Sequence, residues 1–240
     1  MFDGMGTEIE RMQKVALIKE VVRYLAYAFL AFLVAEFLRF TASIDNSEAK
    51  FPELSLVEYA QSFFLIVSGL ISLRFYLSKQ RHFHRHIFML ISALCAMAFI
   101  REQDMHFETF VGDGTWPIPV FAILAVVIYK IFRIRKDLIA EIVSYMKTRS
   151  YGFFSAATIT IFIFSRMFGR TVFWESVMGD QYFRSVKNVA EESLELYGYL
   201  LLMIAVVELA IADKQLKKIK KIPLTDHSME KPQRQFAAAH

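Results

Sequence analysis

The sequence predicts an all-α integral membrane protein with six transmembrane helices in one bundle. Of its 240 residues, 55% are hydrophobic and 15% are aromatic, which leaves too little polar surface for a soluble domain of this length. The apolar residues form six blocks, most of them near the ~20 residues that span a hydrocarbon core. Lys and Arg gather between alternate blocks, as they do in membrane proteins of defined orientation. A soluble protein with buried helices would need polar faces that these blocks lack.

The helices are expected at residues 15–40, 54–77, 86–104, 116–133, 151–169 and 188–212. Several blocks reach the length of a span only by including a terminal charge, whose side chain can extend toward the interface. Residues 133–149 alternate apolar and charged residues at helical spacing. They are expected to extend the fourth helix or to lie in the interface. Residues 1–213 thus form one transmembrane domain, and residues 214–240 are predicted to be a basic, disordered cytoplasmic tail.

The orientation follows from the basic residues. Of the 28 Lys and Arg residues, 21 fall in the N-terminal segment, the second and fourth connections and the C-terminal tail. The other three connections carry only 7 of them, and with the adjoining helix ends they hold 14 of the 24 acidic residues. Because positive loops stay in the cytoplasm, both termini are predicted to be cytoplasmic, in a bacterial-type inner (plasma) membrane. Expected partners are the bilayer and its anionic lipids at the basic face, with no nucleic acid; a homo-oligomer or a membrane partner is left open.

Two further segments carry distinctive residues. The run 81–86 contains His82, His84 and His86 in a short cytoplasmic connection with basic neighbours that would repel a metal ion, so it is expected to be a solvated loop. Residues 171–189 place four aromatic residues among charges, which is typical of an interfacial segment on the outer face. The single cysteine, Cys95, lies in an apolar block and allows no disulfide within the chain.

Ionisable residues from five predicted helices gather near the outer boundary of the bilayer. An ionisable side chain in a membrane segment is costly, so this convergence is the most informative feature of the sequence. The candidate cation-binding or metal-binding residues are Glu58, Glu102, Asp104, His106, Glu191, Glu192 and Glu195. A supporting polar layer consists of Glu36, Arg39, Gln61, Arg101, Arg166, Arg170 and Tyr197.

Helical spacing orders part of this layer. Glu191 and Glu195 are four residues apart and share a face, whereas Glu192 points about 100° away. Asp104, His106 and Glu108 are polar and are separated by single apolar residues. This alternation suits an extended segment that presents three polar groups to one side. Eight carboxylates in the layer, Glu108 included, face four arginines. The surplus carboxylates must be solvated, protonated or neutralised by a cation.

Three functions remain open at this point. The acidic and histidine cluster could bind a divalent metal such as Mn, Fe, Zn or Ca, in an enzyme that acts on a lipid or headgroup. The same carboxylates could belong to a cation or proton transporter or channel component. They could also be purely structural, in an accessory membrane subunit. Neither a nucleotide nor a haem is expected, because there is no nucleotide-binding loop and no facing pair of histidines at one depth.

Overall fold

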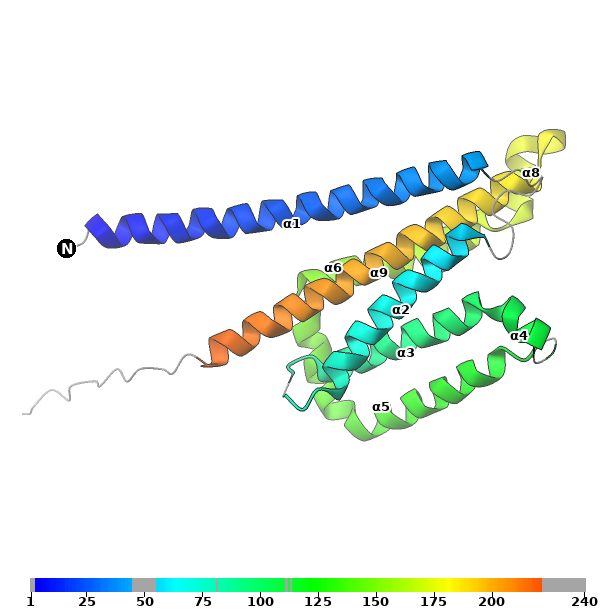
Figure 1. Ribbon diagram of the computed structural model, residues 1–240. Helices are drawn as coiled ribbons and strands as arrows, with labels where there is room; N and C mark the ends of the chain where they lie inside the picture. Colours follow the sequence, from blue (N-terminus) through cyan, green and yellow to red (C-terminus); the bar gives the residue numbers. More distant parts are fainter. Residues whose placement is uncertain (1–2, 45–54, 81, 111, 113, 222–240) are drawn as a thin grey trace, which may run out of the picture.

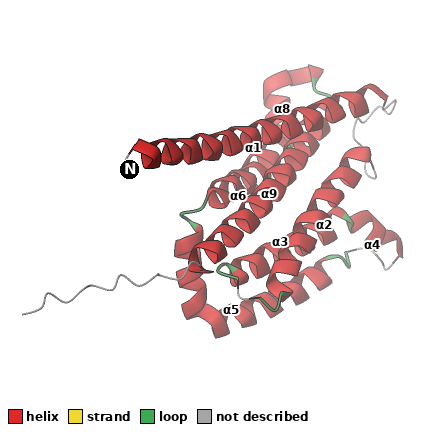
Figure 2. Ribbon diagram, turned by 60° about the vertical axis from the view of Figure 1, so that its left-hand side comes forward, coloured by secondary structure: helices red, strands yellow, loops and turns green. Residues whose placement is uncertain are grey.

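The computed structural model is an all-helical bundle (Figures 1 and 2), which confirms the predicted fold class at this level. It describes residues 3–44, 55–80, 82–110, 112 and 114–221, and no strand occurs among them. The elements are α1 (Asp3–Ile44), α2 (Leu56–Leu77), α3 (Arg85–Glu102), α4 (Asp104–Phe110), α5 (Pro117–Tyr145), α6 (Arg149–Ile159), the π-helical turn η1 (Thr160–Ser165), α7 (Arg166–Phe168), α8 (Thr171–Met178), the 3-10 turn η2 (Gly179–Gln181) and α9 (Arg184–Lys221).

Five helical segments among the described residues are long and apolar enough to cross a membrane. They lie in α1, α2, α5, the continuous run of α6, η1 and α7, and α9. The remaining predicted span is α3, which has 18 residues. At roughly 1.5 Å per residue it reaches about 27 Å, slightly less than the ~30 Å of a hydrocarbon core. It carries Arg85 at its start and Arg101 and Glu102 at its end, so its apolar part is shorter still.

Some helix boundaries differ from the prediction. Helix α5 continues to Tyr145, so residues 133–145 do extend the fourth predicted helix. Helix α9 continues to Lys221, so the first part of the predicted tail is helical; residues 222–240 lie outside the described residues. The prediction of an extended segment at residues 104–108 is wrong, because these residues belong to the short helix α4. Successive helical residues are about 100° apart, so alternate positions do not face one side.

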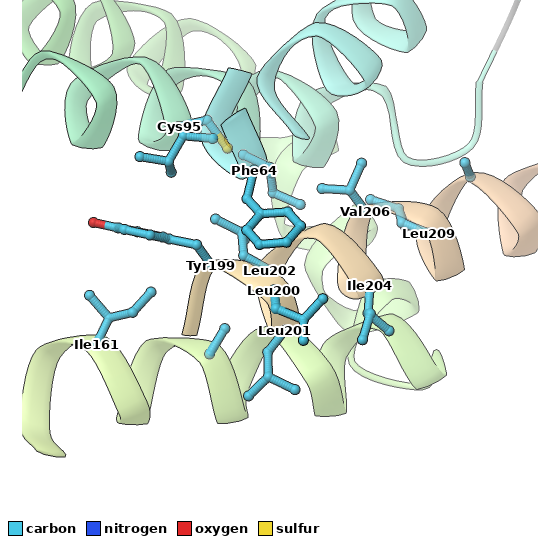
Figure 3. Packing of buried hydrophobic residues seen from close by; sticks show 14 of the residues in the cluster. Phe64, Cys95, Ile161, Tyr199, Leu200, Leu201, Leu202, Ile204, Val206 and Leu209 are labelled. Atoms are coloured by element: carbon cyan, nitrogen blue, oxygen red, sulfur yellow. The ribbon is translucent and has the colours of Figure 1, made fainter. Parts of the chain in front are cut away.

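Helix α9 is the centre of the bundle. In its most apolar stretch 72% of the residues are buried, against 6% in α1 and 0% in α5. It packs against α2 and α6, while α2 also packs on α3, and α3 on α5. Leu65, Phe88, Leu196 and Leu200 are fully buried in one core cluster of α2, α3 and α9. Figure 3 shows Leu200 of α9 within this cluster, near Phe64 of α2. Between membrane helices such contacts stabilise by close packing, because lipid tails are as apolar as the side chains.

The connections sort to two ends of the bundle (Figure 1). The start of α1, the α2–α3 connection, the α5–α6 turn and the end of α9 lie at one end, which we call the basal end. Helices α4 and α8 lie at the opposite end. Helix α1 runs alongside α9 (Figures 1 and 2) and exposes a long apolar face. At about 63 Å for 42 residues, α1 is much longer than a hydrocarbon core is thick.

Candidate functional site

Arg101, at the end of α3, is the centre of an ion-paired layer near the end opposite the basal end. Its Nη2 donates to Glu102 Oε1, to Glu195 Oε2 at 3.0 Å and to Tyr199 Oη at 3.2 Å. Tyr199 in turn donates its hydroxyl proton to Glu102 Oε1 at 2.6 Å. A single guanidinium nitrogen therefore joins α3 to two successive turns of α9.

Glu195 is the most heavily bonded carboxylate of the layer and is 3% exposed. Its Oε1 accepts hydrogen bonds from Ser165 Oγ at 2.9 Å and from Arg166 Nη2. Arg166 Nη1 also lies 3.4 Å from Glu191 Oε1, and Lys187 Nζ lies 3.3 Å from Glu191 Oε2. Glu191 and Glu195 thus share the face of α9 that the sequence predicts, and they share Arg166 as a partner.

Glu192 faces a different neighbour, α2. Gln61 is fully buried, and its Nε2 donates to Glu192 Oε2 at 2.9 Å and to the Glu192 carbonyl at 3.2 Å. On the same side of the layer, Gln103 Nε2 donates to Ser62 Oγ at 2.9 Å. The 100° offset between Glu192 and the Glu191–Glu195 face is what sends Glu192 toward α2.

The backbone between α6 and α7 places Ser165 and Arg166 against α9. Residues Thr160–Ser165 form a π-helical turn, and the extra residue in such a turn rotates everything after it by about 100°. The turn also approaches α9 closely at Gly198, where a Cβ would lie 2.3 Å from Ile161 Cγ1. A glycine at residue 198 is therefore required for this contact, and π-helical turns are frequent at functional sites.

An apolar groove of about 240 Å³ adjoins the layer. Leu94, Met97, Ala98 and Arg101 of α3, Trp116 and Val120 at the start of α5, Ala157, Thr158, Ile161 and Phe162 of α6 and η1, and Tyr199 and Leu202 of α9 line it. The Thr158 hydroxyl donates to the Phe154 carbonyl at 2.9 Å, so it is already engaged. Arg101 and Tyr199 are thus the groove's principal polar groups. The ring of Tyr199 projects from α9 between the helices of Cys95 and Ile161 (Figure 3).

Arg101 has hydrogen-bonding capacity left over for a ligand. Its hydrogen bonds to Glu102, Glu195 and Tyr199 leave only from Nη2, and Nε and Nη1 have no hydrogen-bond partner within the part of the chain that is described. The side chain is 31% exposed and belongs to the wall of the groove. An arginine fork recognises carboxylate or phosphate through two parallel N–H groups. Arg101 can therefore face an anionic group at the polar end of the groove.

Several predicted members of the layer lie elsewhere. Glu36 and Arg39 pair with each other at 2.7 Å on the exposed surface of α1. Asp104, Arg170 and Tyr197 are exposed. Glu58 is half-buried on α2, one turn before Gln61. His106 and Glu108 belong to α4, but their side chains lie outside the described set.

Among the described residues, the layer has a surplus of negative charge. Its four carboxylates, those of Glu102, Glu191, Glu192 and Glu195, accompany the three cations of Arg101, Arg166 and Lys187. Among the described side chains, no group of three or more His, Cys, Asp or Glu residues is arranged to hold a metal ion. The arginines lie between the carboxylates and pair with them. A cation site in this layer therefore stays a prediction.

The histidine connection at the basal end is not the solvated loop expected from the sequence. Asp213 of α9 is fully buried and its Oδ1 accepts the backbone N–H groups of Phe83 at 2.7 Å and His84 at 3.2 Å. Asp213 Oδ2 lies 2.6 Å from His82 Nδ1, and the His84 side chain is fully buried. Glu141 of α5 binds His86 in the same way, with 2.6 Å between Oε1 and Nδ1. The prediction failed because the two acidic partners are more than fifty residues away in sequence.

Of the two tyrosines that follow Glu195 in the sequence, Tyr199 rather than Tyr197 bonds within the layer. Tyr199 is four residues after Glu195 and so lies on the same face of α9. Ser165 and Lys187 are members of the layer that the sequence analysis missed, because they carried no comparable signal. Comparison of the chain with protein-family models, with curated proteins and with solved structures finds no match.

Proposed function

We propose that the chain is an integral membrane protein that binds an anionic, chain-bearing amphiphile in the groove, with the headgroup at Arg101. The observation that carries this proposal is that the groove has an apolar wall and also contains Arg101, whose guanidinium donates hydrogen bonds from only one of its three nitrogens. Ligand sites of this kind are mostly apolar, with a few polar groups that fix the orientation. A phosphate or carboxylate headgroup would take the free Nε and Nη1 donors, and the chain would lie along Leu94 and Leu202.

The proposed topology places this site near the outer face of a bacterial inner membrane. It consists of six spans with both termini cytoplasmic and with α3 as the third span. The distribution of basic residues supports it, since 21 of 28 fall in the N-terminal segment, the second and fourth connections and the C-terminal tail. The groove would then receive its ligand from the outer leaflet.

The test is amphiphile binding by the purified full-length protein in neutral detergent, with lysophosphatidic acid as the probe. Arg101→Gln removes the donors and should weaken binding by at least about tenfold, as expected for a hydrogen bond to a charged group. Val120→Trp should also weaken binding, because the indole fills the groove. Ile118→Trp is the matched control, since Ile118 is on the same helix and 68% exposed. Unchanged binding in both groove variants would contradict the proposal.

A metal-dependent reaction on such a ligand is a second proposal. It is supported by the surplus carboxylate, because Glu192 has Gln61 as its hydrogen-bond partner while the other three carboxylates pair with cations. Elemental analysis after reconstitution with Mn, Zn or Ca should then find a stoichiometric metal that Glu192→Gln removes. If no metal binds under these conditions, the metal-dependent reaction is contradicted and only the ligand-binding proposal stands.

The transport hypothesis makes a separate prediction. Cation or proton flux in liposomes should depend on Glu192 or Glu195, and unchanged flux in Glu192→Gln would exclude Glu192 as the carrier group. An accessory subunit would instead depend on its membrane partner. The exposed apolar faces of α1 and α5 are the surfaces that such a partner would bind. In the absence of a partner, lipid would cover these faces.

A further inference from the structure

A second cavity lies at the basal end, far from the groove. It has a volume of about 450 Å³ and is lined by α1, by the turn between α5 and α6, and by the last turns of α9. We call it the basal cavity. Its walls are mixed, with Ile211 and Leu216 beside charged and hydroxyl-bearing side chains. Three elements that are distant in sequence contribute to it, so it is a product of the tertiary fold.

Each of the elements that meet here brings charge. Arg23 of α1, Lys147 of the turn and Arg149 of α6 are the cations, and Glu20 and Glu208 are the carboxylates. Arg23 Nη1 lies 3.2 Å from Glu208 Oε2, and both Arg23 and Arg149 contact Glu20. Lys147 has no ion-pair partner among the residues that are described. The described side chains that line the cavity therefore have a net positive charge. The cation without an ion-pair partner among them is Lys147, whose side chain is exposed.

The N-terminus of α6 lies at the same place. Thr148 directly precedes this helix, but its hydroxyl donates to the Tyr145 carbonyl at 2.7 Å and does not cap the first turn. The first N–H groups of a helix carry a partial positive charge and bind anions when no side chain caps them. Thr148 and Arg149, at the N-terminus of α6, line the cavity beside Lys147.

The depth of the cavity suits the phosphate layer of a membrane. It lies at the basal end, where Lys147 and Thr148 connect α5 to α6, and Arg149 lies over the ring of Tyr24 with 5.9 Å between the guanidinium carbon and the ring centroid. Tyrosine and arginine side chains are typical of the headgroup level. The anionic groups that phospholipids present at this level are phosphates.

We propose that the basal cavity binds a phosphate group, which an anionic phospholipid headgroup or a soluble phosphate ester can supply. Lys147 and Arg149 contact the phosphate oxygens beside the N-terminus of α6. Glu20 and Glu208 hold the two arginines in position, so they shape the site without neutralising Lys147. The proposal stands on this cavity alone and does not depend on a ligand in the groove.

The test uses the full-length protein in neutral detergent, with phosphatidylglycerol as the probe and native mass spectrometry as the readout. Lys147→Gln should weaken binding about fivefold, the value expected for one basic residue at an anionic surface. Lys136→Gln is the matched control, because Lys136 is an exposed lysine of α5 at the same end of the bundle but outside the cavity. Lysophosphatidic acid binding in the groove should be unaffected by either variant.

Glycerol 3-phosphate distinguishes the two sources of phosphate. If it displaces phosphatidylglycerol from wild type and loses that effect in Lys147→Gln, the cavity accepts a soluble phosphate ester. If it does not compete, while Lys147→Gln still weakens lipid binding, the ligand is a lipid headgroup. Equal losses in Lys147→Gln and Lys136→Gln would overturn the proposal, because they would show diffuse surface attraction. Unchanged binding in Lys147→Gln would overturn it as well.

Discussion

At the scale of single residues, the layer depends on Glu195. Its carboxylate accepts hydrogen bonds from Arg101, Ser165 and Arg166, and it is almost completely buried. Glu195→Ala should lower the free energy of unfolding by about 3–5 kcal/mol, because it leaves two arginines without their shared partner. Thermal unfolding in detergent measures this loss.

Glu36→Ala is the control for this prediction. Glu36 was expected in the same layer, but it pairs with Arg39 on the exposed surface of α1. An exposed pair contributes about 0–1 kcal/mol, so the thermal midpoint should change little. Equal effects of the two variants would contradict the distinction between a buried layer and a surface pair.

His84, outside the membrane-spanning helices, links stability to pH. Burial lowers the pKa of His84 below its ordinary value of 6.5, although Asp213 and Glu141 act in the opposite direction. The folded state therefore favours the neutral ring, and the unfolded state takes up the proton first as the pH falls. This contribution to stability is complete above about pH 6.5 and decreases as the pH falls from there toward the folded-state pKa.

His84→Gln should remove that part of the pH dependence. The variant is expected to be less stable than wild type at pH 8, because it disturbs a fully buried site, and the difference should narrow toward pH 5. Thermal midpoints measured across this range report the comparison. A difference that stays constant or widens toward acid would contradict the lowered pKa.

At the scale of elements, the approach of η1 to α9 depends on Gly198. A Cβ at residue 198 would overlap Ile161, so Gly198→Ala should cost about 1–3 kcal/mol through forced repacking. It should also weaken lysophosphatidic acid binding, because Ile161 lines the groove. Gly152→Ala is the matched control on α6, where nothing lies within 4 Å of an added Cβ. It should be neutral or stabilise by about 0.4–1 kcal/mol.

At the scale of the whole molecule, the topology can be tested by thiol labelling in cells. Cys95 is buried, so a membrane-impermeant maleimide should not label the folded wild type. In Asp180→Cys, on the outer side of the proposed topology, the new thiol should react in intact cells. In Lys147→Cys, at the basal end, it should react only after the membrane is permeabilised. The reverse pattern would contradict the proposed orientation.

The amino-acid sequence by itself determined the helical class and the places of the long helices, because a bilayer demands long apolar runs whose backbone bonds are internal. It also indicated that Glu191 and Glu195 share a face, since that depends only on helical periodicity. It could not assign partners: Arg101 meets Glu195, and Asp213 meets His82, across stretches of about ninety and one hundred and thirty residues.

The tertiary structure alone decided which predicted polar residues belong together. Helix α1 carries Glu36 and Arg39 away from the layer, whereas the π-helical turn brings in Ser165 and rotates Arg166 toward α9. It also decided that α3, α5, α6 with η1, and α9 line an apolar groove with Arg101 in its wall. Periodicity governs which side of a helix a residue occupies, but packing governs which neighbour that side meets.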